Sequence, residues 1–141
     1  MESISKELIS RIIKKRKSAT YKGNYGRLLL IGGSKKYGGA LIMAAEGALN
    51  SGAGLVTVAT DQVNIPALHT RDPESMALNW DESVELKNLI KNVDVVVCGM
   101  GLGLDDKAQQ ILRLVRDNIT LKQTLILDAS ALDLIGQQTD L

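Results

Sequence analysis

A glycine-rich loop is the segment of this sequence whose residue types are best suited to ligand chemistry. Residues 32–39 read Gly-Gly-Ser-Lys-Lys-Tyr-Gly-Gly and stand between an apolar run and a stretch rich in Ala, Leu and Met. Glycine lets a ligand approach the backbone closely, and a helix that begins after such a loop offers free N–H groups to an anion. The loop therefore favours a phosphate or a diphosphate as its ligand.

This loop lacks the residues of an ATP-binding P-loop. Gly33 and Gly38 have the required separation, but Gly39 and Ala40 stand where that motif needs Lys followed by Ser or Thr. Without that ammonium and that hydroxyl there is neither a clamp for a γ-phosphate nor a ligand for its magnesium ion. We therefore exclude a P-loop site at this position.

Two further segments carry candidate chemistry. Residues 99–103 read Gly-Met-Gly-Leu-Gly, a weak dinucleotide-binding signal that a tight turn before a helix explains equally well. Asp128 ends an apolar run, where a carboxylate can hold magnesium, bind a ligand hydroxyl, act as a base or cap the next helix. Cys98 fits a core position, and His69 has no companion in a catalytic pattern, so we expect neither to act chemically.

Continuous apolar runs predict strands that are buried on both faces, and the segments between them predict helices. We expect strands at residues 27–31, 55–60, 94–98 and 124–128, and helices at 4–17, 38–51, 81–91, 105–118 and 129–135. Asp81 is a plausible N-cap of its helix.

Residues 61–80 give a weaker pattern. Residues 63–68 fit a short helix interrupted by Pro66, and residues 72–76 fit a connecting segment. Trp80 is either buried or at the edge of a site.

These elements predict an open α/β fold, with a parallel sheet and helices on both of its faces. Ligands of such sheets bind outside the carboxyl ends of the strands. Three loops have that position, at residues 32–40, 99–103 and 128–131. We therefore expect the functional site where these loops meet.

Composition limits the class of protein. The chain has 141 residues, which we interpret as one domain, and its aromatic content of 3% leaves Leu, Ile, Val, Ala and Met to form the core. A single Cys and a single His make neither a disulfide within the chain nor a zinc site, and no metal ligand is predicted. No apolar run reaches the ~18 residues of a membrane span, and the first ten residues lack the core of a signal peptide. We expect a reduced, cytoplasmic protein.

The N-terminal segment is strongly basic. Residues 1–30 have a net charge of +6, whereas residues 31–141 have −5. We interpret residues 1–20 as a basic amphipathic helix and its lead-in, docked with one face in solvent. No aromatic residue within residues 4–17 could stack on a base or anchor in a membrane, so we expect neither nucleic acid nor a membrane as partner.

Taken together, these motifs resemble the ADP/ATP-dependent NAD(P)H-hydrate dehydratases, a family with a ribokinase-like fold. The matching segments follow in the family's order at residues 22–26, 29–34, 37–40, 44–58, 73–76, 99–103 and 128–132. Met100 stands where the family has Pro in its G-P-G-L-G loop. The resemblance covers essentially the whole chain.

The resemblance implies a reaction that repairs hydrated NADH or NADPH. The extra hydroxyl on the reduced nicotinamide ring is phosphorylated from ADP or ATP, with Mg²⁺, and loss of phosphate restores the ring. It further implies that Gly39 and Ala40 contact the hydrate, that Gly101 and Gly103 let it approach closely, and that Asp128 lines the same cleft. It also implies a homo-oligomer.

Family members are about twice as long as this chain. Their second half carries most of the nucleotide site and the carboxylate that deprotonates the hydroxyl, so we expect no catalytic residue within residues 1–141 and an incomplete fold. We expect the chain alone to be inactive. Two other interpretations stay open: a fragment of a ribokinase-like kinase for a small alcohol, and a non-catalytic binding or assembly module.

Overall fold

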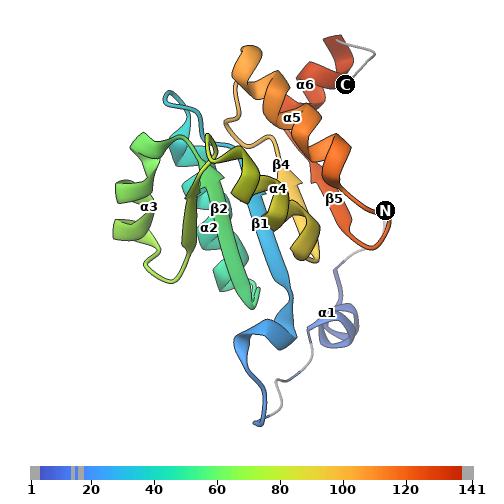
Figure 1. Cartoon of the computed structure of the whole chain (residues 1–141). Coiled ribbons are helices and arrows are strands. Elements are labelled where there is room, and N and C mark those ends of the chain that lie inside the picture. The colour runs from blue at the N-terminus through green and yellow to red at the C-terminus, as the bar shows by residue number, and fades with distance from the viewer. Residues whose placement is uncertain (1–3, 14, 16–17, 138–141) are drawn as a thin grey trace.

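A five-stranded parallel sheet forms the centre of the computed structural model, which describes residues 4–13, 15 and 18–137. The strand order is β3-β2-β1-β4-β5, and every neighbouring pair is parallel (Figure 1). The strands are β1 (Arg27–Ile31), β2 (Leu55–Thr60), β3 (Met76–Asn79), β4 (Val95–Cys98) and β5 (Thr124–Leu127). The expected open α/β fold is confirmed.

Helices connect the strands and cover the sheet. They are α1 (Lys6–Ile12), α2 (Gly38–Asn50), α3 (Ile65–Arg71), α4 (Ser83–Asn92), α5 (Asp106–Asn118) and α6 (Ser130–Gln137), with short 3₁₀ turns η1 (Lys22–Tyr25) and η2 (Gln62–Asn64). The helices expected at 38–51 and 105–118 and the four expected strands agree with these bounds to within one residue.

The central strand β1 divides its side chains between two apolar layers. Leu29 and Ile31 pack with α4, α5 and α6 on one face, and Leu30 packs with Leu41 and Ala45 of α2 on the other. Figure 1 shows α4 in front of the sheet and α2 behind it. Successive side chains of a strand point to opposite faces, so an unbroken apolar run is what a strand covered on both faces requires.

The strand β3 was not predicted from the sequence, and its first residue, Met76, was expected to lie in a connecting segment. The strand Met-Ala-Leu-Asn has no β-branched residue, and only Leu78 in it is buried. Its pairing with β2, from Thr57 opposite Met76 to Thr60 opposite Asn79, makes it a strand. Long-range pairing here overrides a weak local preference.

Two helix boundaries also differ from expectation. Pro66 does not interrupt a helix but lies in the first turn of α3. Backbone N–H groups in the first turn have no acceptor within the helix, so a proline there costs no helical hydrogen bond. Asp81 is not an N-cap, because α4 begins at Ser83 and Glu82 holds the N-cap position without a side-chain cap.

The expectation of a docked N-terminal helix is wrong for the described residues. The helix runs only from Lys6 to Ile12 and buries no residue, and Ile12 is 70% exposed. Figure 1 shows α1 beyond the amino-terminal end of β1, away from the two packed layers. Much of the basic run expected to end this helix lies outside the described residues, and no described helix has the length and apolarity to span a membrane.

One end of the sheet keeps an apolar face open. Leu125 and Leu127 of β5 pack against the α4–α5 layer, so Ile126 between them points to the opposite face, where it is 48% exposed. Leu132 of α6 is also 54% exposed. The layer of α2 and α3 therefore covers β1 and β2 but leaves Ile126 uncovered.

The buried thiol of Cys98 yields a test of this packing. Cys98 has no exposed surface, and burial raises the pKa of its thiol to about 12. We expect a thiol-specific reagent at neutral pH to leave the native chain unmodified and to modify it once denaturant unfolds it. Modification of the native chain at the rate of a free cysteine would contradict the buried position of β4.

Candidate functional site

The loops after β1 and β4 are joined by backbone hydrogen bonds beyond the ends of their strands. The N–H of Gly33 donates to the carbonyl of Met100 at 2.9 Å, and the N–H of Ser34 donates to the carbonyl of Gly101 at 2.6 Å. The pairing of β1 with β4 thus continues into the loops. The sequence predicted that both loops lie at the carboxyl edge of the sheet, and this prediction is confirmed.

The loops approach each other so closely that side chains do not fit between them. A Cβ atom on Gly32 would lie 2.2 Å from the carbonyl oxygen of Met100, and one on Gly101 would lie 2.3 Å from that of Tyr37. Gly101 also has a φ of +63°, which other residues rarely adopt. The third loop joins the same contact, because a Cβ on Gly99 would lie 1.9 Å from the carbonyl oxygen of Asp128.

A buried polar pair behind the first loop was missed by sequence analysis. The carbonyl of Gly33 accepts hydrogen bonds from Oγ1 of Thr60 at 2.8 Å and from Nδ2 of Asn64 at 2.6 Å. Both side chains are buried. Such a pair stabilises a backbone carbonyl that would otherwise be buried without a donor. The one signal in the sequence was Thr60, a polar residue at the end of the apolar run of β2.

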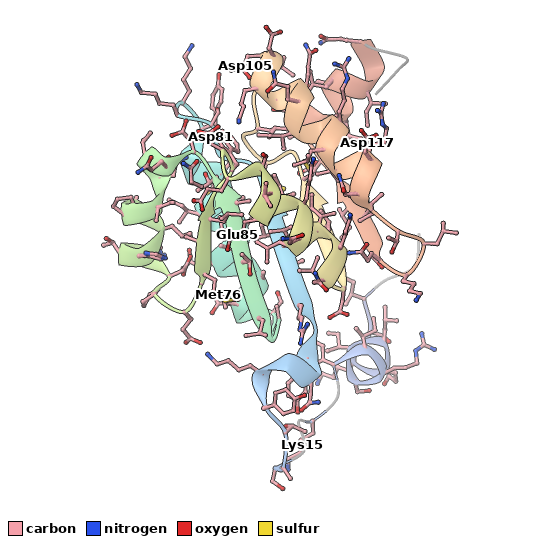
Figure 2. The ribbon with its side chains drawn as sticks, viewed as in Figure 1. Lys15, Met76, Asp81, Glu85, Asp105 and Asp117 are labelled. Carbon is pink, nitrogen blue, oxygen red and sulfur yellow. The ribbon has the colours of Figure 1, made fainter. Side chains whose placement is uncertain are left out.

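A cavity of about 820 Å³ opens at this edge of the sheet. Its walls are residues 34–37 and Ala40 from the first loop and α2, residues 101–105 and Lys107 from the second loop and α5, Asp61, Trp80 and Asp81 from the β2 and β3 ends, and Ser130 of α6. In Figure 2, Asp81 and Asp105 lie at this end of the molecule and Met76 lies farther down the sheet. A second depression, of about 800 Å³, is lined only by α4 and the turn before it, so it lacks converging elements.

Three of the five predicted site residues line the cavity: Ala40, Gly101 and Gly103. Gly39 is an exposed neighbour of Ala40 in the first turn of α2. Asp128 is exposed and its side chain is not part of the cavity wall; its backbone, rather than its carboxylate, contacts the second loop. Trp80, whose place the sequence left open, is 5% exposed and lines the cavity.

Most charged groups of the wall already have partners. Lys107 forms an ion pair with Asp81 across the cavity mouth. Asp61 accepts a hydrogen bond from the N–H of Val63, and Asp105 accepts one from the N–H of Ala108 as the N-cap of α5. These carboxylates therefore stabilise turns and helix ends, and nothing in the wall resembles an acid–base pair.

The fold and this cavity define a class: a parallel α/β protein that binds its ligand at the carboxyl edge of the sheet, between glycine loops. The family model described as NAD(P)H-hydrate dehydratase matches residues 28–141. The chain belongs to this family, as the motifs predicted.

Curated relatives and solved structures agree with this assignment. The chain is 49% identical over 98% of its length to the ADP-dependent (S)-NAD(P)H-hydrate dehydratase of Lactiplantibacillus plantarum and 47% identical over 97% to that of Enterococcus faecalis, covering 50% and 47% of those proteins. A crystal structure of a ribokinase-like superfamily protein from Enterococcus faecalis superposes with a TM-score of 0.92 at 48% identity, over 95% of this chain and 47% of that one.

A more distant relative was crystallised with a nucleotide. The ADP/ATP-dependent NAD(P)H-hydrate dehydratase of Bacillus subtilis, co-crystallised with ATP/Mg²⁺, matches with a TM-score of 0.75 at 27% identity, over 91% of this chain and 46% of that one. The chain thus spans about half the length of the relatives it matches. The ribokinase-like fold is confirmed, in the incomplete form that was expected.

The close contact between the loops can be tested with one methyl group. We expect Gly32→Ala to lower the free energy of unfolding by about 2 kcal/mol, because its Cβ would overlap the Met100 carbonyl. Gly47→Ala in α2 is the matched control: its Cβ meets nothing within 4 Å, and Ala stabilises a helix interior by up to about 1 kcal/mol relative to Gly. Urea denaturation measures both, and equal effects of the two substitutions would contradict the close contact.

Proposed function

We propose that this chain supplies the hydrate-binding half of an ADP- or ATP-dependent NAD(P)H-hydrate dehydratase. The observation that carries the proposal is the cavity between the loops, with Ala40, Gly101 and Gly103 in its lining, in a chain 49% identical to an enzyme of that name. The substrate is hydrated NADH or NADPH.

The predicted residues have distinct roles in this proposal. Ala40, with Gly39 beside it in the first turn of α2, contacts the hydrated ring. Gly101 and Gly103 let the ring approach the backbone of the second loop, since a glycine has no side chain to hold it off. Asp128 stands beside the cleft rather than in its wall, so in this proposal it positions only the turn that leads into Ser130 of α6.

The co-substrate is ADP or ATP with Mg²⁺, by analogy with the relative co-crystallised with ATP/Mg²⁺. Within the described residues no three His, Cys, Asp or Glu side chains gather to hold a metal ion, so we assign no magnesium ligand to them. The base that deprotonates the hydroxyl belongs, in this proposal, to the polypeptide that corresponds to the second half of the relatives.

The open face beside β5 is where that second half would dock. Ile126 exposes apolar surface there, and burying such surface favours association. We further propose that the protein forms a homo-oligomer and acts in the cytoplasm on a soluble nucleotide.

Complementation tests the proposed function. We expect the chain alone, given hydrated NADH, ADP or ATP and Mg²⁺, to leave the absorbance of NADH unrecovered. Mixed with a polypeptide corresponding to the second half of the Lactiplantibacillus plantarum relative, it should restore that absorbance. Ala40→Leu narrows the cavity and should abolish the recovery, while Gly47→Ala should leave it intact.

Three outcomes would contradict the proposal. Recovery of NADH by the chain alone would show that it carries the base. Phosphorylation of a small alcohol without repair of the hydrate, by the assembled halves, would favour a kinase. Association of the halves without either reaction would favour a non-catalytic assembly module.

A further inference from the structure

The three lysines that line the cavity differ in their electrostatic state. Lys107 is neutralised by Asp81. Lys35 and Lys36 have no ion pair or hydrogen bond to their ammonium groups anywhere in the described part of the chain, and both side chains are exposed. Among the described residues, these two neighbours are the only cations of the cavity wall without an ion pair, and together they form its cationic rim.

The turn that carries this rim is fixed at its base. Lys35 and Lys36 occupy the middle of a turn closed by a hydrogen bond from the N–H of Tyr37 to the carbonyl of Ser34 at 2.9 Å. Ser34 is in turn bonded to the second loop, and the carbonyl of Gly33 before it is held by Thr60 and Asn64. Because these hydrogen bonds already order the backbone of the turn, a ligand that binds the two ammonium groups does not have to order it, and the entropic cost of binding is lower.

The interior of the same cavity is apolar by contrast. Trp80 is 5% exposed and Leu102 is 1% exposed, and both line it. A dinucleotide has matching parts: a flat ring suited to an apolar wall, and a diphosphate suited to lysine ammonium groups. Both surfaces are satisfied together when one of the dinucleotide's two rings points inward and the diphosphate crosses the rim, and the proposed function selects the nicotinamide because that ring reacts.

We propose that Lys35 and Lys36 bind the diphosphate of the hydrated dinucleotide and thereby orient its nicotinamide ring toward Trp80. This inference rests on the proposed function and adds to it the residues that select a dinucleotide over a bare nicotinamide riboside. The neutralised Lys107 has no part in it.

The chain contains its own reporter for the test. Trp80 is the only tryptophan and lies in the cavity wall, so its fluorescence responds to a bound reduced nicotinamide. The probes are NADH, which is the product of the proposed reaction, reduced nicotinamide riboside, which has the same ring without phosphate, and ADP, which has a diphosphate without that ring. Each is titrated into the full chain at two salt concentrations.

We expect the Lys35→Gln/Lys36→Gln double variant to weaken NADH binding about tenfold and to reduce its salt dependence, because two charge-assisted contacts are lost. Binding of the riboside should not change. The matched control Lys107→Gln should alter NADH affinity less than about threefold, since its charge is already paired at the surface. Melting temperatures should be equal, because all three side chains are at least partly exposed.

The possible failures are distinguishable. Equal NADH affinity in the double variant and the wild type, or an equal loss in Lys107→Gln, would overturn the inference while leaving the proposed function standing. ADP binding as tight as NADH binding, with the same dependence on Lys35 and Lys36, would overturn the orientation. No response of Trp80 to NADH, to the riboside or to hydrated NADH would instead count against the hydrate-binding cavity itself.

Discussion

The close backbone contact between the loops after β1 and β4 is the constraint on which the candidate site depends. Gly32 and Gly101 allow carbonyl groups of the facing loops into the space that a Cβ atom would take. The hydrogen bonds from Gly33 and Ser34 then join the two loops as a continuation of the sheet. Because a parallel sheet brings only its carboxyl ends to this edge, the contact is possible at one end of the fold alone.

This contact fixes the two loops that form much of the cavity wall. The cavity wall has few side chains free to do chemistry, since its carboxylates Asp61 and Asp105 hold turns and helix ends. Such a wall suits recognition of a ring and a phosphate chain more than proton transfer. The chain spans about half the length of its relatives, and in the proposed function the reaction is completed by a polypeptide that corresponds to their other half.

Several exposed apolar residues lie away from this cavity's wall. Ile126 faces outward from the edge strand β5, and α1 presents Ile9 and Ile12 without packing them on any described layer. The partner proposed for β5 is the segment that corresponds to the second half of the relatives.

The sequence by itself determined the strands β1, β2, β4 and β5, the order of the elements and the edge of the sheet that holds the site. Unbroken apolar runs and glycine loops are local signals, readable without knowing what they contact. The family motifs were equally local, and they predicted the assignment that the comparisons confirmed.

Only the tertiary structure decided what depends on residues distant in the chain. The strand β3 exists because β2 lies beside it, and Trp80 reaches the cavity because β3 ends there. Likewise, Asn64 meets the carbonyl of Gly33, 31 residues away, across the sheet edge. None of these three features has a strong local preference in the sequence. They were determined by packing and hydrogen bonding between distant segments, and no short window of sequence contains both partners.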